Sequence, residues 1–159
     1  FCLGVGTMSE LDLFRVAEVE LVYRSKVPAS QRPKVKSSRD VYRLFIENWN
    51  QDKIEYLEEA KLLLLSRGSG VLGIYNLSSG GTAGTIVDPK LVFAAALKAN
   101  ASSIILAHNH PSGNLQPSEQ DVRLTRRIRE AGKLLDLELL DHLIVSKQGY
   151  YSFADECSL

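Results

Sequence analysis

The chain has 159 residues, of which 45% are hydrophobic and 24% are charged, a composition typical of a globular domain with its own core. Nineteen basic and nineteen acidic side chains give zero net charge, so total charge provides no argument for binding nucleic acid or an anionic membrane. No apolar run approaches the roughly 20 residues of a membrane-spanning helix. The first ten residues lack the features of a signal peptide and the chain has two cysteines, so we expect a cytoplasmic protein without a disulfide framework.

The N-terminal part of the chain is predicted to be an extension that precedes the domain. Residues 16–26 alternate in hydropathy as an edge strand does. Residues 27–38 are rich in proline, serine and lysine, which indicates a connecting loop. We therefore predict an extension of residues 1–36, with an edge strand and a linker, and a single domain of residues 37–159.

The first half of this domain begins with an amphipathic helix. Ser38 can cap a helix that runs to about Asn50. Its predicted inner stripe is Val41, Leu44, Phe45 and Trp49. The apolar segments 62–65 and 71–75 flank Arg-Gly-Ser-Gly, which predicts a hairpin.

Further elements follow the hairpin. Residues 82–87 are predicted to form a strand, and Asp88 and Pro89 suit the N-cap and the first position of the next helix. The apolar segment 102–107 predicts a buried strand.

The second half of the domain is predicted to contain one long helix and two closing strands. The helix extends from about Ser118 to Leu135, and its inner positions are Leu124, Ile128, Ala131 and Leu135. Residues 137–145 and 150–153 are predicted to be strands around a Lys-Gln-Gly turn. The sum is an α/β domain of the α+β type, with a mostly antiparallel sheet and flanking helices.

Two histidines follow the buried strand with one residue between them. If the strand continues through them, His108 and His110 point to the same side, because strand side chains repeat every two residues. The loop after them lets the chain turn back, so that the next helix can bring Asp121 to the same ion. Two imidazoles, one carboxylate and a water are a credible zinc site for hydrolysis.

Each part of this pattern also has a structural interpretation. A His-x-His pair alone occurs in ordinary loops, and Ser118-x-x-Asp121 fits a capping box in which the serine caps the helix and the acid reaches back. The conjunction of strand, histidine pair, seven residues and Ser-x-x-Asp favours a metal site. His142 lies in an apolar strand and is the alternative third ligand, which would give a three-histidine site.

The pattern His-x-His-x7-Ser-x2-Asp at residues 108–121 resembles the JAMM motif of the JAB/MPN metalloprotease superfamily. The longer string HNHPSGN, the serine and aspartate after it, and LLDHLIV resemble the RadC family within that superfamily. The resemblance covers roughly residues 37–156 and implies an MPN/JAB-like fold, similar to that of cytidine deaminases. RadC proteins often carry a preceding helix-hairpin-helix segment, and residues 1–36 show no such pattern.

The resemblance also implies the roles of the site residues. His108, His110 and Asp121 would hold Zn²⁺, and Ser118 would donate a hydrogen bond to the oxyanion of a tetrahedral intermediate. An upstream glutamate would be the general base, and the RadC-like Glu-x-Phe register favours Glu58 over Glu59, with Ala60 at the phenylalanine position. The implied activity is zinc-dependent hydrolysis of an amide bond in a peptide or protein substrate, and substrates in the superfamily are often isopeptides.

Two other functions compete with this one. The family is traditionally associated with DNA repair, and the last helix is rich in arginine, which predicts at most weak DNA contact. A non-catalytic MPN scaffold is the second competitor, but inactive members usually lose motif residues, and this chain has both histidines, the serine and the aspartate. The sequence predicts neither a membrane partner nor an oligomeric state.

Overall fold

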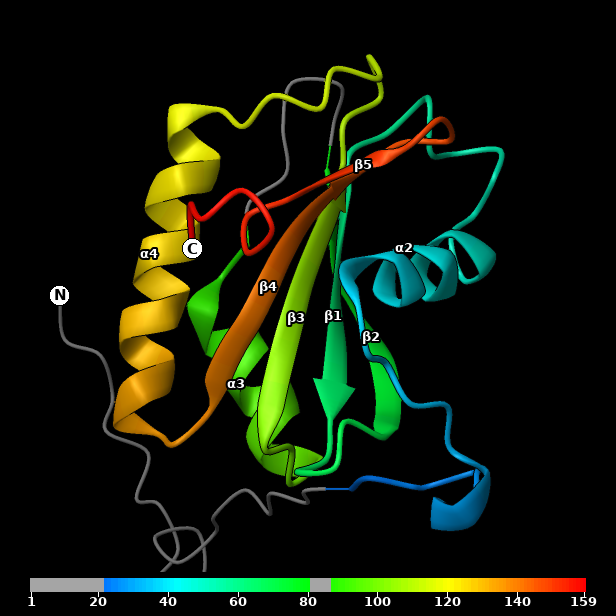
Figure 1. Cartoon of the computed structure of the whole chain (residues 1–159), viewed down its shortest axis with the longest axis vertical. Coiled ribbons are helices and arrows are strands. Elements are labelled where there is room, and N and C mark those ends of the chain that lie inside the picture. Colours follow the sequence, from blue (N-terminus) through cyan, green and yellow to red (C-terminus); the bar gives the residue numbers. More distant parts are fainter. Residues whose placement is uncertain (1–21, 81–86) are drawn as a thin grey trace, which may run out of the picture.

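A computed structural model describes residues 22–80 and 87–159, which form one mixed sheet with helices on both faces (Figure 1). In chain order the elements are η1 (Ala29–Gln31), α2 (Ser38–Glu47), β1 (Glu59–Leu65), β2 (Val71–Ser79), α3 (Pro89–Lys98), β3 (Ser103–Asn109), α4 (Glu119–Leu134), β4 (Glu138–Val145) and β5 (Tyr150–Ser152).

The five strands lie in the order β2-β1-β3-β4-β5. Only β3 and β4 pair in parallel, while the other three pairings are antiparallel. The parallel pair needs a crossover, and α4 provides it between the end of β3 and the start of β4. The predicted α+β class and the mostly antiparallel sheet are therefore confirmed.

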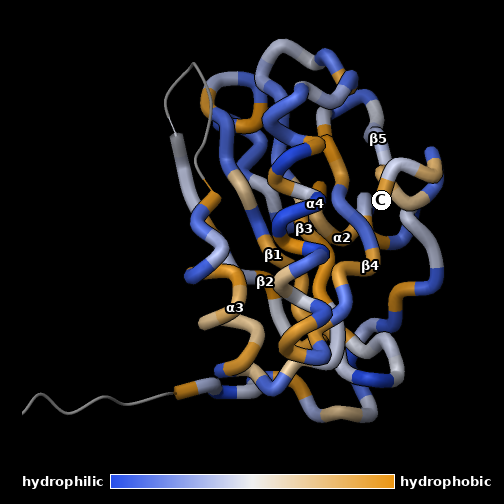
Figure 2. The backbone as a smooth tube through the Cα atoms, turned by 90° about the vertical axis from the view of Figure 1, so that its left-hand side faces the viewer, coloured by the Kyte–Doolittle hydropathy of each residue, from blue (hydrophilic) through white to orange (hydrophobic). Residues whose placement is uncertain are grey.

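The sheet separates two hydrophobic cores because side chains alternate along its strands. Leu62 and Leu64 of β1 face α3 and α4, whereas Leu63 and Leu65 face α2. The two helical layers lie on opposite sides of the sheet in Figure 1. Figure 2 shows hydrophobic stretches along the central strands. His108 has the strand parity of Leu106 and therefore lies on the α4 face.

The helix starts follow the capping residues of the sequence with one correction. Asp88 caps α3 by accepting a hydrogen bond from the Lys90 backbone N–H, as predicted. In α2 the cap is Ser37 instead of Ser38, because Ser37 has extended dihedral angles and accepts from the Asp40 N–H. The hydroxyl of Ser38, already inside the helix, donates to Asp155.

The ends of these helices differ modestly from the prediction. α2 ends at Glu47 and not near Asn50, although Trp49 beyond its end is still buried. In α4, Leu135 is 43% exposed and not an inner residue. Gly132 takes the inner position instead, because β4 approaches so closely that a Cβ there would lie 2.2 Å from the Leu137 carbonyl oxygen.

The predicted edge strand at residues 16–26 is not found where the chain is described. Residues 22–26 are irregular, and residues 16–21 lie outside the described residues. Tyr23 does lie beside β2, but the recorded contact is a side-chain one, from its hydroxyl to the Leu72 carbonyl oxygen at 2.7 Å. The alternation of hydropathy therefore does not correspond to a backbone ladder here.

Most of the strand predicted at residues 82–87 falls in a part of the chain that the structure does not describe, namely residues 82–86. Val87 is described and is irregular, because it immediately precedes the N-cap of α3. No helix in residues 22–80 or 87–159 has both the length and the hydropathy required to span a bilayer.

Candidate metal centre

Two histidines stand at the carboxyl end of β3, between two neighbouring strands. His108 is the next-to-last residue of β3, where it pairs with Ala60 of β1 and Ile144 of β4. His110 follows the strand, and its backbone N–H still contacts the Val145 carbonyl oxygen. Strand pairing on both sides therefore fixes the backbone from which the first imidazole projects.

The start of α4 brings an aspartate to the same place. Ser118 is the N-cap, and its hydroxyl oxygen accepts from the Asp121 backbone N–H. The Asp121 carboxylate reaches back and accepts from the Ser118 N–H and O–H, both at 2.7 Å. The predicted capping box thus forms, and it orients the aspartate toward the end of β3.

His108, His110 and Asp121 converge into one group. The two Nε2 atoms are 3.0 Å apart, and the Asp121 carboxylate oxygens lie 3.2 Å from His108 Nε2 and 3.7 Å from His110 Nε2. One ligand atom of each residue lies within 4.8 Å of the others, so the group could hold a metal ion. His108 and Asp121 are buried and His110 is half-buried.

The donor set suits a cation. His110 Nδ1 contacts the Asn114 carbonyl oxygen, which can only accept, so Nδ1 has the hydrogen and Nε2 is the ring nitrogen left to bind a metal ion. Burial favours the neutral acid at Asp121, but its polar contact with His108 and the hydrogen bonds from Ser118 outweigh burial. They hold the pKa of Asp121 well below its usual range, so the carboxylate is ionised at neutral pH.

The third histidine lies beneath this group and does not join it. His142 Nε2 is 2.9 Å from His108 Nδ1, and His142 Nδ1 is 2.6 Å from the Thr125 hydroxyl oxygen. Burial and the neighbouring His108 lower the pKa of His142 well below its usual value, against the opposing charge of Asp121. Both ring nitrogens of His142 are thus engaged, which disfavours the three-histidine site.

Comparison with known proteins identifies the fold that carries this site. The profile of the RadC-like JAB domain matches residues 35–158. The chain belongs to the RadC-like JAB domain family. This finding confirms the family resemblance and the JAB/MPN fold predicted from the motif, and it covers every residue of the candidate metal centre.

The relatives extend beyond the length of this chain. It is 40% identical over 156 residues to a UPF0758 protein of Flavobacterium johnsoniae and 42% identical over 160 residues to one of Porphyromonas gingivalis. A UPF0758 protein of Thermotoga maritima is 37% identical over 159 residues. These alignments cover 96%, 96% and 98% of this chain but only 65%, 66% and 68% of the relatives.

Asn109, between the two histidines of this JAB domain, fastens the segment before β1. Its side chain is fully buried; Nδ2 donates to the carbonyl oxygens of Ile54 and Leu57, at 2.6 and 2.8 Å. Oδ1 accepts from the Glu59 N–H at 2.7 Å. One buried amide thus connects the histidine-bearing strand end to the chain that leads into β1.

The register of β1 and β3 separates the two candidate glutamates. Ala60 is opposite His108 at the end of the recorded pairing. Glu58 lies just before β1 and His110 just after β3, and if the antiparallel pairing is extended by two residues, Glu58 comes opposite His110 on the α4 face. Glu59 lies on the other face together with Lys61, whose ammonium is 4.9 Å from the centre of the Trp49 ring. Burial lowers the pKa of Lys61, and the charge of Glu59 partly offsets that effect.

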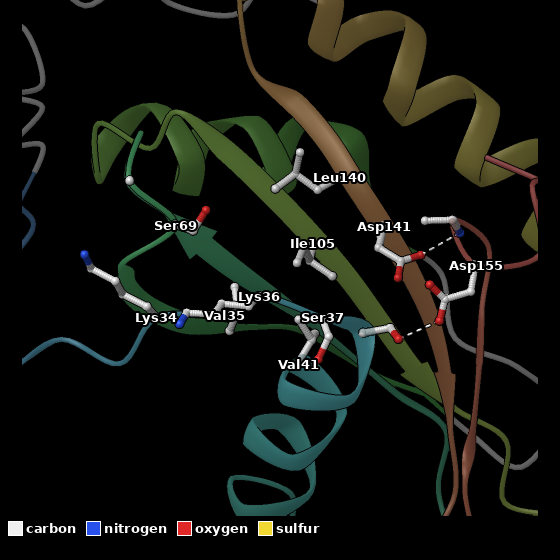
Figure 3. Close-up of a pocket in the computed structure, with 13 residues that line it drawn as sticks. Lys34, Val35, Lys36, Ser37, Val41, Ser69, Ile105, Leu140, Asp141 and Asp155 are labelled. Atoms are coloured by element: carbon white, nitrogen blue, oxygen red, sulfur yellow. Dashed lines mark hydrogen bonds between the residues drawn. The ribbon is translucent and has the colours of Figure 1, made fainter.

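A cavity of about 540 Å³ lies away from the histidines, on the α2 face, where Figure 3 shows Ile105 of β3 and Asp141 of β4 among the residues that line it. A cavity of about 380 Å³ adjoins the site itself and is lined by His110, Ser112 and the Lys147–Glu55 ion pair. The cavity on the α2 face is therefore on the opposite face of the sheet from the candidate metal ligands.

We expect Asn109→Ala to lower the free energy of unfolding by about 2–4 kcal/mol, because three buried hydrogen bonds are lost at about 1 kcal/mol or more each. Urea unfolding measures this change. Asn114→Ala is the matched control, since Asn114 is exposed in the next loop and its side chain only accepts from the Gln116 N–H. Equal destabilisation by both variants would contradict the fastening role of Asn109.

Proposed function

We propose that this JAB domain is a zinc-dependent metallohydrolase, a metallopeptidase or isopeptidase that cleaves an amide bond in a peptide or protein substrate. The observation that carries the proposal is the convergence of His108, His110 and Asp121 at the end of β3 and the start of α4. Family membership supports it, because JAB domains with this motif use zinc in the superfamily that the sequence resembles.

Zinc fits the donor set better than the other common metals. Magnesium and calcium prefer oxygen ligands only, whereas two imidazoles and one carboxylate with an open fourth position are typical of catalytic zinc. When bound, zinc lowers the pKa of its water ligand, which becomes the nucleophile, and polarises the scissile carbonyl. The rest of the reaction is assigned to side chains of this chain.

Glu58 is the proposed general base. It would accept one proton from the attacking water and deliver it to the nitrogen of the leaving amine, so that amide and water become a carboxylic acid and an amine. Extending the pairing of β1 with β3 by two residues brings Glu58 opposite His110 on the α4 face, which supports this role. Glu59 is the weaker candidate because it shares the opposite face with Lys61.

Ser118 is proposed to act twice. In the structure its hydroxyl donates to Asp121 Oδ2, which also accepts from the Ser118 backbone N–H. Rotation of the hydroxyl would leave that carboxylate oxygen with one donor and provide a hydrogen bond to the oxyanion of the tetrahedral intermediate. Capping and catalysis are therefore compatible roles for the same side chain.

Weak DNA contact is the second proposal, and the basic face of α4 is its only support. Two of the arginines on this face already have partners within the chain. Arg123 pairs with Glu119, and Arg129 donates to the Leu159 carbonyl oxygen. A non-catalytic scaffold is disfavoured because His108, His110 and Asp121 lie together and Ser118 contacts Asp121.

We expect the protein to bind about one zinc ion per chain and Asp121→Ala to lose most of it, because two imidazoles alone leave the site without its anionic ligand. Elemental analysis of folded protein after dialysis measures the content. Glu119→Ala is the control: Glu119 lies two residues earlier on α4, is exposed and pairs with Arg123. Full zinc in Asp121→Ala would overturn the ligand set.

Glu58→Gln is expected to slow hydrolysis by about 100-fold or more, because a positioned general base contributes at least that factor. Glu59→Gln, one residue away on the other face, is the matched control. Both variants are compared with the wild type at equal zinc content on a fluorogenic peptide and isopeptide library. Loss of activity in Glu59→Gln alone would show that the strand register does not identify the base.

A further inference from the structure

We propose that Thr125 and His142 are positioning residues that fix the ring tautomer of His108, so that its Nε2 presents a lone pair to the metal. Three contacts carry the inference. Thr125 Oγ1 lies 2.7 Å from the Asp121 carbonyl oxygen, His142 Nδ1 lies 2.6 Å from Thr125 Oγ1, and His108 Nδ1 lies 2.9 Å from His142 Nε2.

The Asp121 carbonyl oxygen at the end of this series of contacts determines which atom donates in each hydrogen bond. A carbonyl oxygen has no hydrogen to give, so the contact with it takes the single hydroxyl hydrogen of Thr125. The hydrogen between Thr125 and His142 must then come from His142 Nδ1. Thr125 therefore acts as an acceptor toward the imidazole and as a donor toward the helix backbone.

The burial of His142 determines the donor in the remaining hydrogen bond, between His142 and His108. Its ring has no exposed surface and stacks on Phe153 at 4.9 Å, and its nitrogens contact a hydroxyl and an imidazole instead of a carboxylate. Such a ring is neutral. With its hydrogen on Nδ1, His142 Nε2 can only accept, and the hydrogen in the last contact belongs to His108 Nδ1.

These hydrogen-bond directions determine which nitrogen of His108 is left for the metal. With its hydrogen held on Nδ1, His108 has Nε2 left to bind a metal ion, and Nε2 is the atom that faces His110 and Asp121. In free histidine the Nε2–H tautomer predominates, and that form would present a hydrogen to the ion. Partners of the distal ring nitrogen commonly set the tautomer of metal-binding histidines.

This series of contacts also links two proposed metal ligands, His108 and Asp121, through the core. It starts at His108 on β3, passes through β4, and ends at the backbone of Asp121 in the first turn of α4. Asp141 holds the backbone at the middle of this path, since its carboxylate accepts from the His142 N–H and the Ser152 hydroxyl. The inference rests on the proposed function only for the use of the lone pair; the hydrogen-bond directions stand without it.

The tautomer is tested first in metal-free wild-type protein labelled with ¹⁵N-histidine. The chain has three histidines, so three rings are assigned, and ¹⁵N shifts distinguish protonated from unprotonated ring nitrogens. We expect a hydrogen on Nδ1 of both His108 and His142. A His108 ring that has no hydrogen on Nδ1 would overturn the inference whatever the protein hydrolyses.

Two variants test the consequence for zinc. Thr125→Val keeps the side-chain shape but removes the acceptor for His142, whereas Thr125→Ser keeps the hydroxyl. We expect Thr125→Val to shift His108 toward the Nε2–H tautomer and to weaken zinc binding by about 10–100-fold in a chelator competition. Thr125→Ser should retain the wild-type tautomer and affinity. Unchanged tautomer and zinc affinity in folded Thr125→Val would contradict the proposal; hydrolysis is not part of the readout.

Discussion

The parallel pairing of β3 with β4 is the constraint on which the rest of the site depends. It requires a crossover, and the crossover helix α4 begins beside the strand end that carries His108 and His110. A capping box then turns the Asp121 carboxylate toward those imidazoles. Because the end of β3 and the start of α4 are each fixed by backbone hydrogen bonds, His108 and Asp121 meet at a fixed place, and His110 joins them directly after the strand.

The same strand pairing organises the groups around the donors. His142 lies on β4 directly beside Leu106 of β3, so its ring can reach under His108. On the other flank, β1 is antiparallel to β3, so the residues that precede β1 lie toward the end of β3 that His110 follows. Asn109 points to the opposite face and closes that flank with its three buried hydrogen bonds. Membership of the RadC-like JAB domain family is consistent with a site built into the centre of the fold.

Local patterns in the sequence predicted most of the fold and the donors of the site. Hydropathy period and capping residues placed α3, α4 and the central strands, and the spacing of residues 108–121 identified the three residues that meet. The choice between Ser37 and Ser38 needed backbone dihedral angles, because adjacent serines can both cap a helix. Leu135 was misjudged because close approach of β4 selects Gly132, whose missing side chain leaves no hydropathy signal.

Contacts between residues that are distant in the sequence could not be predicted from it. His108 and His142 are 34 positions apart, and His142 and Thr125 are 17 apart, so no local period relates them. Likewise, Glu58 and Glu59 are equivalent acids in the sequence, and only the register of β1 against β3, extended to the residues before Ala60, puts them on different faces. Residues 22–26, the described part of the predicted edge strand, are irregular despite their alternating hydropathy, because only pairing with a neighbour makes an extended segment a strand.

The most direct test of the central claim is zinc K-edge X-ray absorption of the protein loaded with one equivalent of zinc. We expect a four-coordinate ion with two imidazole nitrogens and two oxygens, one from the Asp121 carboxylate and one from water. This ligand set follows from the convergence of two ring nitrogens and one carboxylate and from the engagement of both His142 nitrogens elsewhere. A site with three imidazoles, or with a sulfur ligand, would contradict it.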